Sequence, residues 1–272
     1  MALYDLTDPG KLERPALVVA LDGWVNAGSA GTGAAEALTD DAVIIARFDG
    51  DSLFDYRLTR PTVDFEAGVM ERVGWPRLEL FHQPLTGRDL LILTGTEPSW
   101  NWQRLGHDVA ELAMRLEVVE SISIGGISWA APHTRPVTLI TTASSSDRVT
   151  GEHPDGLLRV PGAAVNVIEF AMTRSGIPAM GFWARVPHYV GSSYYAASLA
   201  LVERIGVHLG VDLPKGDLDL EAADQREQLD GIVRERADLK KMVAKLEELV
   251  DGEQVVSGEE LAAEIERFLK SQ

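Results

Sequence analysis

The chain of 272 residues has 13 Pro, 25 Gly and no Cys, and 45% of it is apolar, which is enough for the core of one or two globular domains. Its net charge of −17 disfavours nucleic acids and anionic membrane surfaces as partners, because both are negatively charged. The N-terminus has no apolar leader, and no run of about 18 apolar residues occurs, so we expect a cytoplasmic protein.

Apolar runs alternate with helical patterns through most of the chain. Continuous apolar runs are typical of strands that are buried on both faces of a sheet. They lie at 16–21, 42–48, 90–95, 121–126, 137–142 and 179–186. Helical spacing occurs at 28–39, 101–117, 162–175 and 194–209. This order predicts a three-layer α/β/α domain with a mainly parallel sheet. Prolines interrupt 54–86, where we expect a hairpin or an irregular excursion.

The composition changes after residue 213. From Pro214 onward, acidic residues outnumber basic ones by 16 to 9. Apolar residues recur in steps of three and four through 229–250, interrupted by Arg236, and Ser257 begins a second predicted helix. We therefore predict a core domain at 1–213 and an acidic helical hairpin at 214–272. The hairpin is either a lid on its own core or an interaction surface. The candidate surface residues are Leu239, Val243, Leu246 and Phe268.

The first strand runs into a turn of small residues, 21–38, that opens a helix. Its glycines do not match a dinucleotide fingerprint, and Ser29 stands where a phosphate-binding Walker loop requires Lys. The small residues are better explained by a helix that lies close to the sheet, although backbone N–H groups there leave a nucleotide site open.

Glu97 follows another strand, in the block GTEPSWNW at 95–102. In a cleft between tryptophans it could act as a general acid or base. The simpler interpretation makes it a carboxylate at a helix N-terminus, with Ser99 as the cap.

Further strand ends supply the remaining candidates for a cleft at the carboxyl edge of the sheet. Paired glycines at 125 and 126 permit a close backbone approach, and the long polar loop 144–161 is typical of a lid or a binding loop. The six His are scattered, so we predict no metal site and no cofactor. The candidate cleft residues are Trp24, Asn26, Gly28, Asp49, Glu97, Trp102, Gly125 and Gly126.

Four sequence blocks in this order resemble the proteasome assembly chaperone 2 family, in its bacterial, actinomycete-type branch. They are DGWVNAGSA at 22–30, GTEPSWNW at 95–102, the glycine pair at 125–126 and VPHYVGSSYYAAS at 186–198. The resemblance implies a phosphorylase/hydrolase-like α/β/α fold with a mixed sheet. It also implies a non-enzymatic chaperone of proteasome α-subunits that forms a homo-oligomer, with three copies. The final residues, Phe268 to Gln272, lack the penultimate Tyr of archaeal docking tails, so the resemblance does not extend to that tail.

Two functions remain open from the sequence. The first is a self-associating assembly factor that binds a protein partner without catalysis, because no catalytic motif is complete. The alternative is a small-molecule-binding protein or an enzyme, of nucleotide, nucleoside or hydrolase type, that uses the cleft at the sheet edge.

Overall fold

The computed structural model describes residues 2–191 and 193–252, and its centre is an eight-stranded sheet in the order β1-β3-β6-β7-β2-β8-β10-β9. The central strands β7, β2, β8 and β10 are parallel, whereas β6 and β9 pair antiparallel with β7 and β10. The predicted mixed, mainly parallel sheet is confirmed. The strands are β1 Tyr4–Leu6, β2 Ala16–Asp22, β3 Val43–Phe48, β6 Leu78–Leu85, β7 Arg88–Thr96, β8 Glu120–Trp129, β9 Leu139–Ala143 and β10 Ala179–Pro187.

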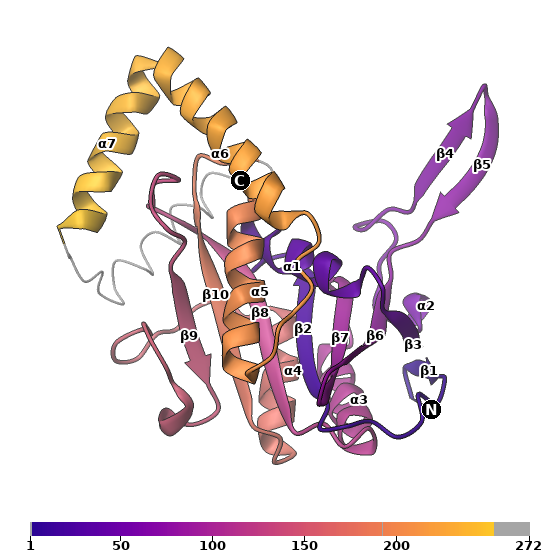
Figure 1. Ribbon diagram of the computed structural model, residues 1–272. Coiled ribbons are helices and arrows are strands. Elements are labelled where there is room, and N and C mark those ends of the chain that lie inside the picture. The colour runs from indigo at the N-terminus through magenta and orange to yellow at the C-terminus, as the bar shows by residue number, and fades with distance from the viewer. Residues whose placement is uncertain (1, 192, 253–272) are drawn as a thin grey trace.

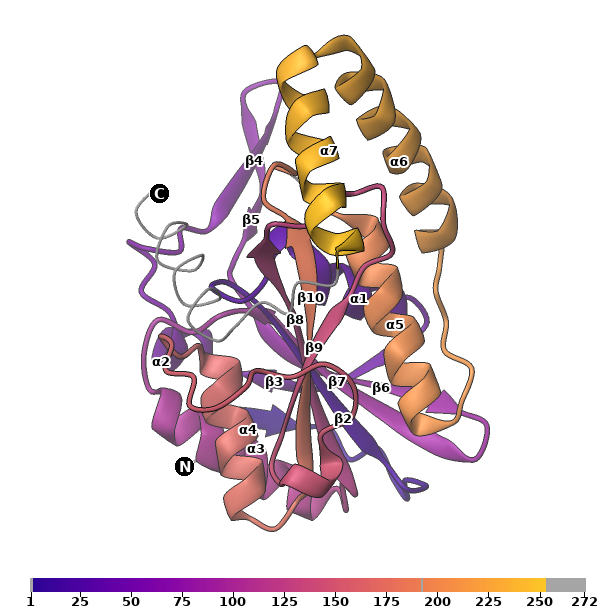
Figure 2. The same cartoon turned by 90° about the vertical axis from the view of Figure 1, so that its left-hand side faces the viewer.

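Helices cover both faces of this sheet (Figures 1 and 2). α3 and α4 pack on one face, and α1 and α5 pack on the other. Successive residues of β2 alternate between the faces, so that Leu17 and Val19 join the first core cluster and Val18 the second. Burial on both faces explains why the strands are continuously apolar. The helices are α1 Ala30–Thr39, α2 Gly50–Leu53, α3 Trp102–Arg115, α4 Ala164–Arg174 and α5 Tyr195–Leu209, with 3-10 turns at Ala27–Ser29 and Ser146–Arg148.

The small residues at the start of α1 place this helix close to the sheet. A side chain at Gly31 would have its Cβ 3.0 Å from the Ile124 carbonyl oxygen, and Ala30, Ala34 and Ala35 are fully buried. On the same face, Leu201 of α5 is fully buried, and a side chain of this size stabilises the fold by about 1.5–3 kcal/mol when it leaves water. The close-packing interpretation of the turn at 21–38 is therefore confirmed.

Residues 54–86 form the predicted hairpin and one strand that the sequence analysis placed wrongly. β4 (Thr62–Glu66) and β5 (Val69–Gly74) form a two-stranded sheet, which we call the arm; it extends away from the body (Figure 1). β6 is not an irregular edge segment but pairs with both β3 and β7. Pro84 is tolerated because it lies at the β6–β7 turn, opposite Asp89, where the ladder ends.

The acidic tail forms two helices that meet at Arg236. α6 spans Leu218–Glu235 and α7 spans Ala237–Asp251. The apolar repeat over 229–250, which the sequence interrupts at Arg236, is divided between two helices at that residue, because Arg236 has an extended backbone that turns the chain. α6 packs along α5 through Leu218 and Leu229 (Figure 1). The helix predicted from Ser257 lies outside the described residues, and the domain boundary at 213 stays a prediction.

Among the helices in the described part of the chain, none combines the length and the apolar character needed to cross a membrane.

Candidate functional site

The loop after β2 is held against the middle of β8 by the glycine pair. The Gly126 N–H donates to the Val25 carbonyl oxygen at 2.9 Å, and Asn26 pairs with Gly126 as a parallel bridge. A Cβ at Gly125 would lie 2.2 Å from the Val25 oxygen, and one at Gly126 would lie 2.3 Å from the Ala27 oxygen. Only glycine permits this contact, so the close backbone approach expected from the sequence is present.

Asn26 occupies the N-terminus of α1. Its side chain is buried, and Oδ1 accepts hydrogen bonds from the N–H groups of Gly31 at 2.9 Å and Thr32 at 3.2 Å. Its amide donates to Thr32 Oγ1 at 2.8 Å and to Asp22 Oδ1 at 3.2 Å. Asn26 thus satisfies N–H groups of the first helical turn that have no partner within the helix.

Glu97 also lies at a helix N-terminus, but not at that of the helix that follows it in the chain. Its Oε1 accepts a hydrogen bond from the Ala164 N–H at 2.8 Å, at the start of α4, and Oε2 accepts one from the Trp24 N–H at 3.4 Å. The predicted cap, Ser99, instead accepts the Asp55 N–H at 3.0 Å. The partial positive charge at the start of α4 stabilises the Glu97 carboxylate.

A cavity of about 610 Å³ opens at this carboxyl edge of the sheet. The loop before α4 forms one wall, β9 and β10 supply its floor, and the β2–α1 loop and Glu97 close the other side. The predicted long polar loop therefore does border the cleft, with mainly apolar side chains. The lining residues are Gly23, Trp24, Val25, Asn26, Ala27, Glu97, Ile127, Ser128, Ile140, Thr142, Pro154, Leu158, Val160, Pro161, Asn166 and Trp183.

Of the eight predicted cleft residues, three line this cavity, namely Trp24, Asn26 and Glu97, and the two glycines of β8 shape its rim.

The other three predicted cleft residues lie elsewhere. Gly28 has a φ of +59° and packs against Tyr194. Asp49 caps α2 by accepting the Asp51 N–H at 3.2 Å, and Trp102 donates its indole N–H to the Pro98 carbonyl oxygen at 2.6 Å. Each follows a strand or begins a helix, but none of the three lines the cavity.

The lining residues of β9 and β10 were not predicted from the sequence. Trp183 is 6% exposed, and its indole N–H donates to Thr142 Oγ1 at 3.0 Å, on the adjacent strand. Gly181 leaves room for this ring, because a Cβ there would lie 2.7 Å from the indole nitrogen. The sequence did contain a signal for this part of the cavity: Trp183 follows Gly181 by two residues in the same strand, so that both lie on one face and the glycine leaves room for the ring.

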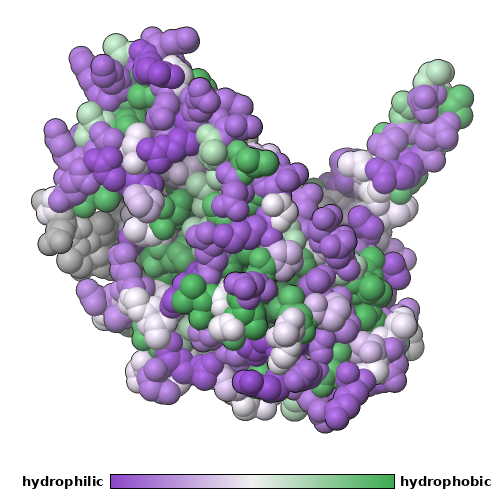
Figure 3. All heavy atoms as spheres, in the orientation of Figure 1, coloured by the Kyte–Doolittle hydropathy of each residue, from purple (hydrophilic) through white to green (hydrophobic). Residues whose placement is uncertain are grey.

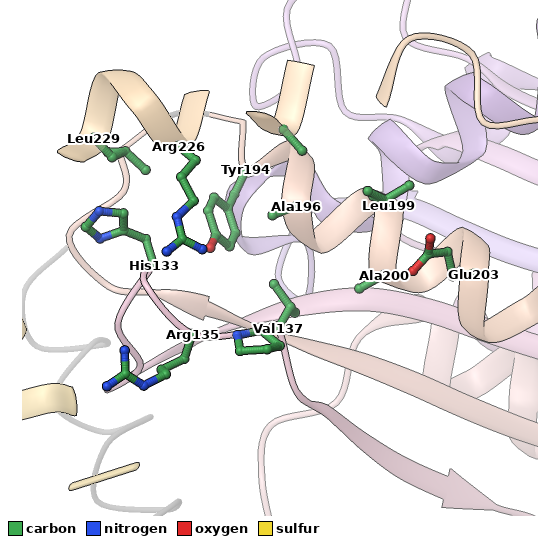
Figure 4. Close-up of a pocket in the computed structure, with 12 residues that line it drawn as sticks. His133, Arg135, Val137, Tyr194, Ala196, Leu199, Ala200, Glu203, Arg226 and Leu229 are labelled. Atoms are coloured by element: carbon green, nitrogen blue, oxygen red, sulfur yellow. The ribbon is translucent and has the colours of Figure 1, made fainter. Parts of the chain in front are cut away.

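A second, smaller cavity of about 240 Å³ lies between α5, α6 and the loop after β8 (Figure 4). Arg226 and Tyr194 point into the same space, and burial raises the pKa of Tyr194 to about 12. His133 is buried beside them: its Nδ1 lies 2.7 Å from the Tyr189 hydroxyl and its Nε2 lies 3.2 Å from Asp230 Oδ1 of α6. Burial lowers the pKa of His133. These groups join the body to α6.

α7 is fastened to the same loop by charged groups. Arg135 pairs with Glu247 at 3.1 Å and with Asp251 at 2.6 Å, and the Thr134 hydroxyl donates to Glu247 at 2.5 Å.

The predicted interaction surface on α7 is largely not available in this arrangement. Val243 and Leu246 are buried and Leu239 is half-buried, while Phe268 lies outside the described residues. The physical reason is the orientation of α7: the helix is held by the contacts of Glu247 with Thr134 and Arg135, and in this orientation Val243 and Leu246 are buried.

The apolar side chains of the arm are more exposed than those of α7, where Leu249 and Val250 are 41% and 42% exposed. Phe65 is 63% exposed, Val69 59% and Met70 58%, and Figure 3 shows hydrophobic side chains among the polar ones on the arm. Of the hydrogen bonds and ion pairs between described residues, none joins β4 or β5 to the body.

Three potential metal ligands share one turn of α3. His107, Asp108 and Glu111 offer ligand atoms within 4.8 Å of one another. His107 and Glu111 are exposed, and Asp108 accepts the Leu3 N–H at 2.7 Å. Helical spacing and this hydrogen bond explain the cluster without an ion.

Comparison with known proteins identifies the family. The PAC2 family model matches residues 20–233. The Mycobacterium tuberculosis protein Rv2714, described as of unknown function, is 32% identical with a TM-score of 0.87, over 92% of this chain and 89% of that one. A Corynebacterium glutamicum protein of unknown function is 29% identical with a TM-score of 0.85, over 92% and 98%. The M. tuberculosis proteasome-assembly chaperone homologue Rv2125 is 29% identical with a TM-score of 0.77, over 84% and 99%.

No curated protein matches the sequence. The resemblance to actinomycete proteins of this family, inferred from four sequence blocks, is nonetheless confirmed, and the chain belongs to the PAC2 family.

Proposed function

We propose that this protein is a non-enzymatic assembly factor that self-associates through its arm and binds a protein partner. The observation that carries the proposal is the exposed apolar surface of the arm. Every residue of β4 and β5 except Gly74 is exposed, and an isolated two-stranded sheet is marginally stable in water. Phe65 and Met70 would leave water if a second copy of the chain packed against the arm.

A closed homo-oligomer fits this arm better than an open chain of copies. Closed symmetry gives each arm the same acceptor surface and leaves no arm unpaired. The carboxyl edge of the sheet offers exposed aromatic residues for that acceptor, since Trp100 is 45% and Trp24 is 38% exposed. Three copies is the number that the family resemblance implies.

The partner that the family resemblance suggests is the proteasome, through its α-subunits. One relative is described as a proteasome-assembly chaperone homologue, and the archaeal neighbour PbaB, similar in fold at 16% identity, is described as a proteasome activator. With a net charge of −17, the chain would bind a basic patch on its partner, and added salt would weaken that binding.

The test is co-purification from the native host. The full-length chain carries a tag, and the proteasome α-subunits recovered with it are quantified by mass spectrometry. Enrichment of α-subunits by the wild type, and its loss in Phe65→Asp, supports the proposal. The matched control is Leu220→Asp on α6, whose side chain is 68% exposed, and it should retain the α-subunits. Recovery of no α-subunit with the wild type would reject the proteasome as partner.

The cavity at the carboxyl edge favours a second candidate function, binding of a small molecule. A cavity of about 610 Å³ falls in the usual size range of ligand pockets, and a few polar groups converge on it.

A further inference from the structure

We infer that the cavity of about 610 Å³ binds a mainly apolar small molecule that carries a protonated amine, and that it rejects phosphates and nucleotides. The inference deepens the second candidate function and does not depend on the arm or on a protein partner. It follows from the walls of the cavity, from its two adjacent helix N-termini and from its charge.

The walls favour an apolar ligand. The floor is formed by Trp183 and Ile140, which are 6% and 4% exposed, and the loop before α4 contributes Leu158 and Val160. A ligand that displaces water from these side chains gains about 25 cal/mol for each Å² of apolar surface it covers. A ligand whose polar groups face these walls would lose its water there without replacement hydrogen bonds.

At both helix N-termini at this edge, N–H groups of the first turn already donate to acceptors of the protein. A phosphate usually binds to free N–H groups at the start of a helix. At α1, the N–H groups of Gly31 and Thr32 donate to Asn26. At α4, the N–H of Ala164 donates to the Glu97 carboxylate, which therefore occupies the position that an anion would take.

The charge of the lining completes the argument. Glu97 is the only charged residue among the described residues that line the cavity, and none of them is Lys, Arg or His. An anionic ligand would be repelled by the carboxylate, and the repulsion is strong because the surroundings are apolar. An ammonium group would instead donate a charge-assisted hydrogen bond to Glu97.

Ser128 adds a hydroxyl oxygen to the same lining, which can accept a second hydrogen bond from the amine. Asn166 lines the cavity too, but its Oδ1 already accepts the Ala163 N–H at 2.9 Å, and its side-chain NH₂ is a donor that gives the amine no contact.

Four probes, three of them matched in their naphthalene ring, test the inference on the full-length chain by isothermal titration calorimetry. They are 1-naphthylmethylamine, 1-naphthalenemethanol, 1-naphthoate and, as the nucleotide, AMP. A hydrogen bond to a charged group contributes about 1.5–3 kcal/mol, so we expect the amine to bind at least about tenfold more tightly than the alcohol. Naphthoate should bind more weakly than the alcohol, and AMP should not bind at millimolar concentration.

Variants assign the effect to the cavity. Glu97→Gln should reduce affinity for the amine by about tenfold and leave the alcohol unchanged, because the amide still accepts the Ala164 N–H. Glu36→Gln, an exposed position on α1, removes one carboxylate away from the cavity and should change neither affinity. Ser128→Trp should block all binding, and Val160→Trp, at a side chain that is 42% exposed, is a second blocking variant if the first does not fold.

Three results would overturn the inference. Binding of naphthoate or AMP as tight as that of the amine would show a wrong ligand class at a real site, provided that the blocking variants abolish it. An unchanged amine affinity in Glu97→Gln would remove Glu97 as the recognising group. Failure of all four probes to bind would reject the second candidate function itself, while the assembly proposal would stand or fall by its own test.

Discussion

The arm and the α6–α7 pair both extend from the sheet, but they are attached to the body in different ways. α6 and α7 are joined to the loop at 133–135 by His133, Thr134 and Arg135, and Val243 and Leu246 of α7 are buried. The arm has no such fastening among the described residues, and its apolar side chains are exposed. The charged side chains that fasten α7 already have partners within the chain, whereas the apolar side chains of the arm are in contact with water. The arm is therefore the stronger candidate for an interface.

Charge substitution on the arm has the largest expected effect. Phe65→Asp combined with Met70→Asp removes two apolar side chains from the proposed interface, each worth about 1.5–3 kcal/mol when buried. The dissociation constant of the oligomer should rise at least about 100-fold, measured by size-exclusion chromatography with light scattering.

The same double change on α6 is the control. Leu220 and Ile232 are 68% and 50% exposed, and Leu220→Asp with Ile232→Asp should leave the oligomer intact. Dissociation in this control and not in the arm variant would transfer the interface to the helical pair.

The body and the helical pair should respond to pH with opposite signs. Burial raises the pKa of Glu169, on α4, to about 7. Since this folded-state pKa lies above the unfolded value, the contribution to stability is complete below about pH 4.5 and is lost as the pH rises through about 7. Glu169→Gln should therefore stabilise the protein at pH 8 by about 1–3 kcal/mol and much less at pH 5, measured by urea unfolding. An equal gain at both pH values would contradict this assignment.

Loss of Arg135 should loosen α7 alone. Arg135→Gln removes the ion pairs with Glu247 and Asp251, so amide hydrogen exchange in α7 should become several-fold faster while exchange in β2 and β8 stays unchanged. Arg72→Gln removes an ion pair within the arm, with Asp64, and serves as the matched control. Faster exchange throughout the molecule would mean that α7 is not a separate unit.

The smallest expected effect is the protonation of His133. Burial lowers the pKa of His133 below its usual value, so the docked state favours the neutral ring and loses stability as the pH falls below about 6.5. Tyr189, Asp230, Arg226 and Glu247 face or surround this ring. Exchange in α6, corrected for the intrinsic rate, should be modestly faster at pH 5.5 than at pH 7.5. His133→Gln should remove that difference; its persistence would assign the pH effect to another group.

Strand and helix patterns predicted most of the body correctly, because the apolar spacing of each element lies within a contiguous stretch of sequence. The six apolar runs are all strands, of which β2, β7, β8 and β10 are buried on both faces. The four helical segments of the body match α1, α3, α4 and α5 to within a few residues. The errors concern positions where a rule based on the local sequence did not predict the structure of the folded chain. Pro84 lies in β6, at a turn where it breaks no central hydrogen bond, and Arg236 ends α6 in the middle of an apolar repeat.

The site was only half predictable from the sequence. Strand order placed Trp24, Asn26 and Glu97 at one edge, because parallel strands bring their carboxyl ends together. Gly28, Asp49 and Trp102 satisfy the same rule but lie outside the cavity. The backbone of Gly28 lies against Tyr194, and the side chains of Asp49 and Trp102 hydrogen-bond to residues near them in the chain.

The sequence by itself determined the layered α/β/α body, the glycine pair that admits the β2–α1 loop, and the resemblance to the PAC2 family, since each is encoded in contiguous residues. Only the tertiary structure decided that Glu97 accepts a hydrogen bond at the start of α4, 67 residues away in the chain. It also decided that Val243 and Leu246 of α7 are buried while Phe65 and Met70 of the arm are exposed. These outcomes depend on long-range contacts. The sequence shows which kinds of contact a side chain can make, and the folded structure determines which of them form.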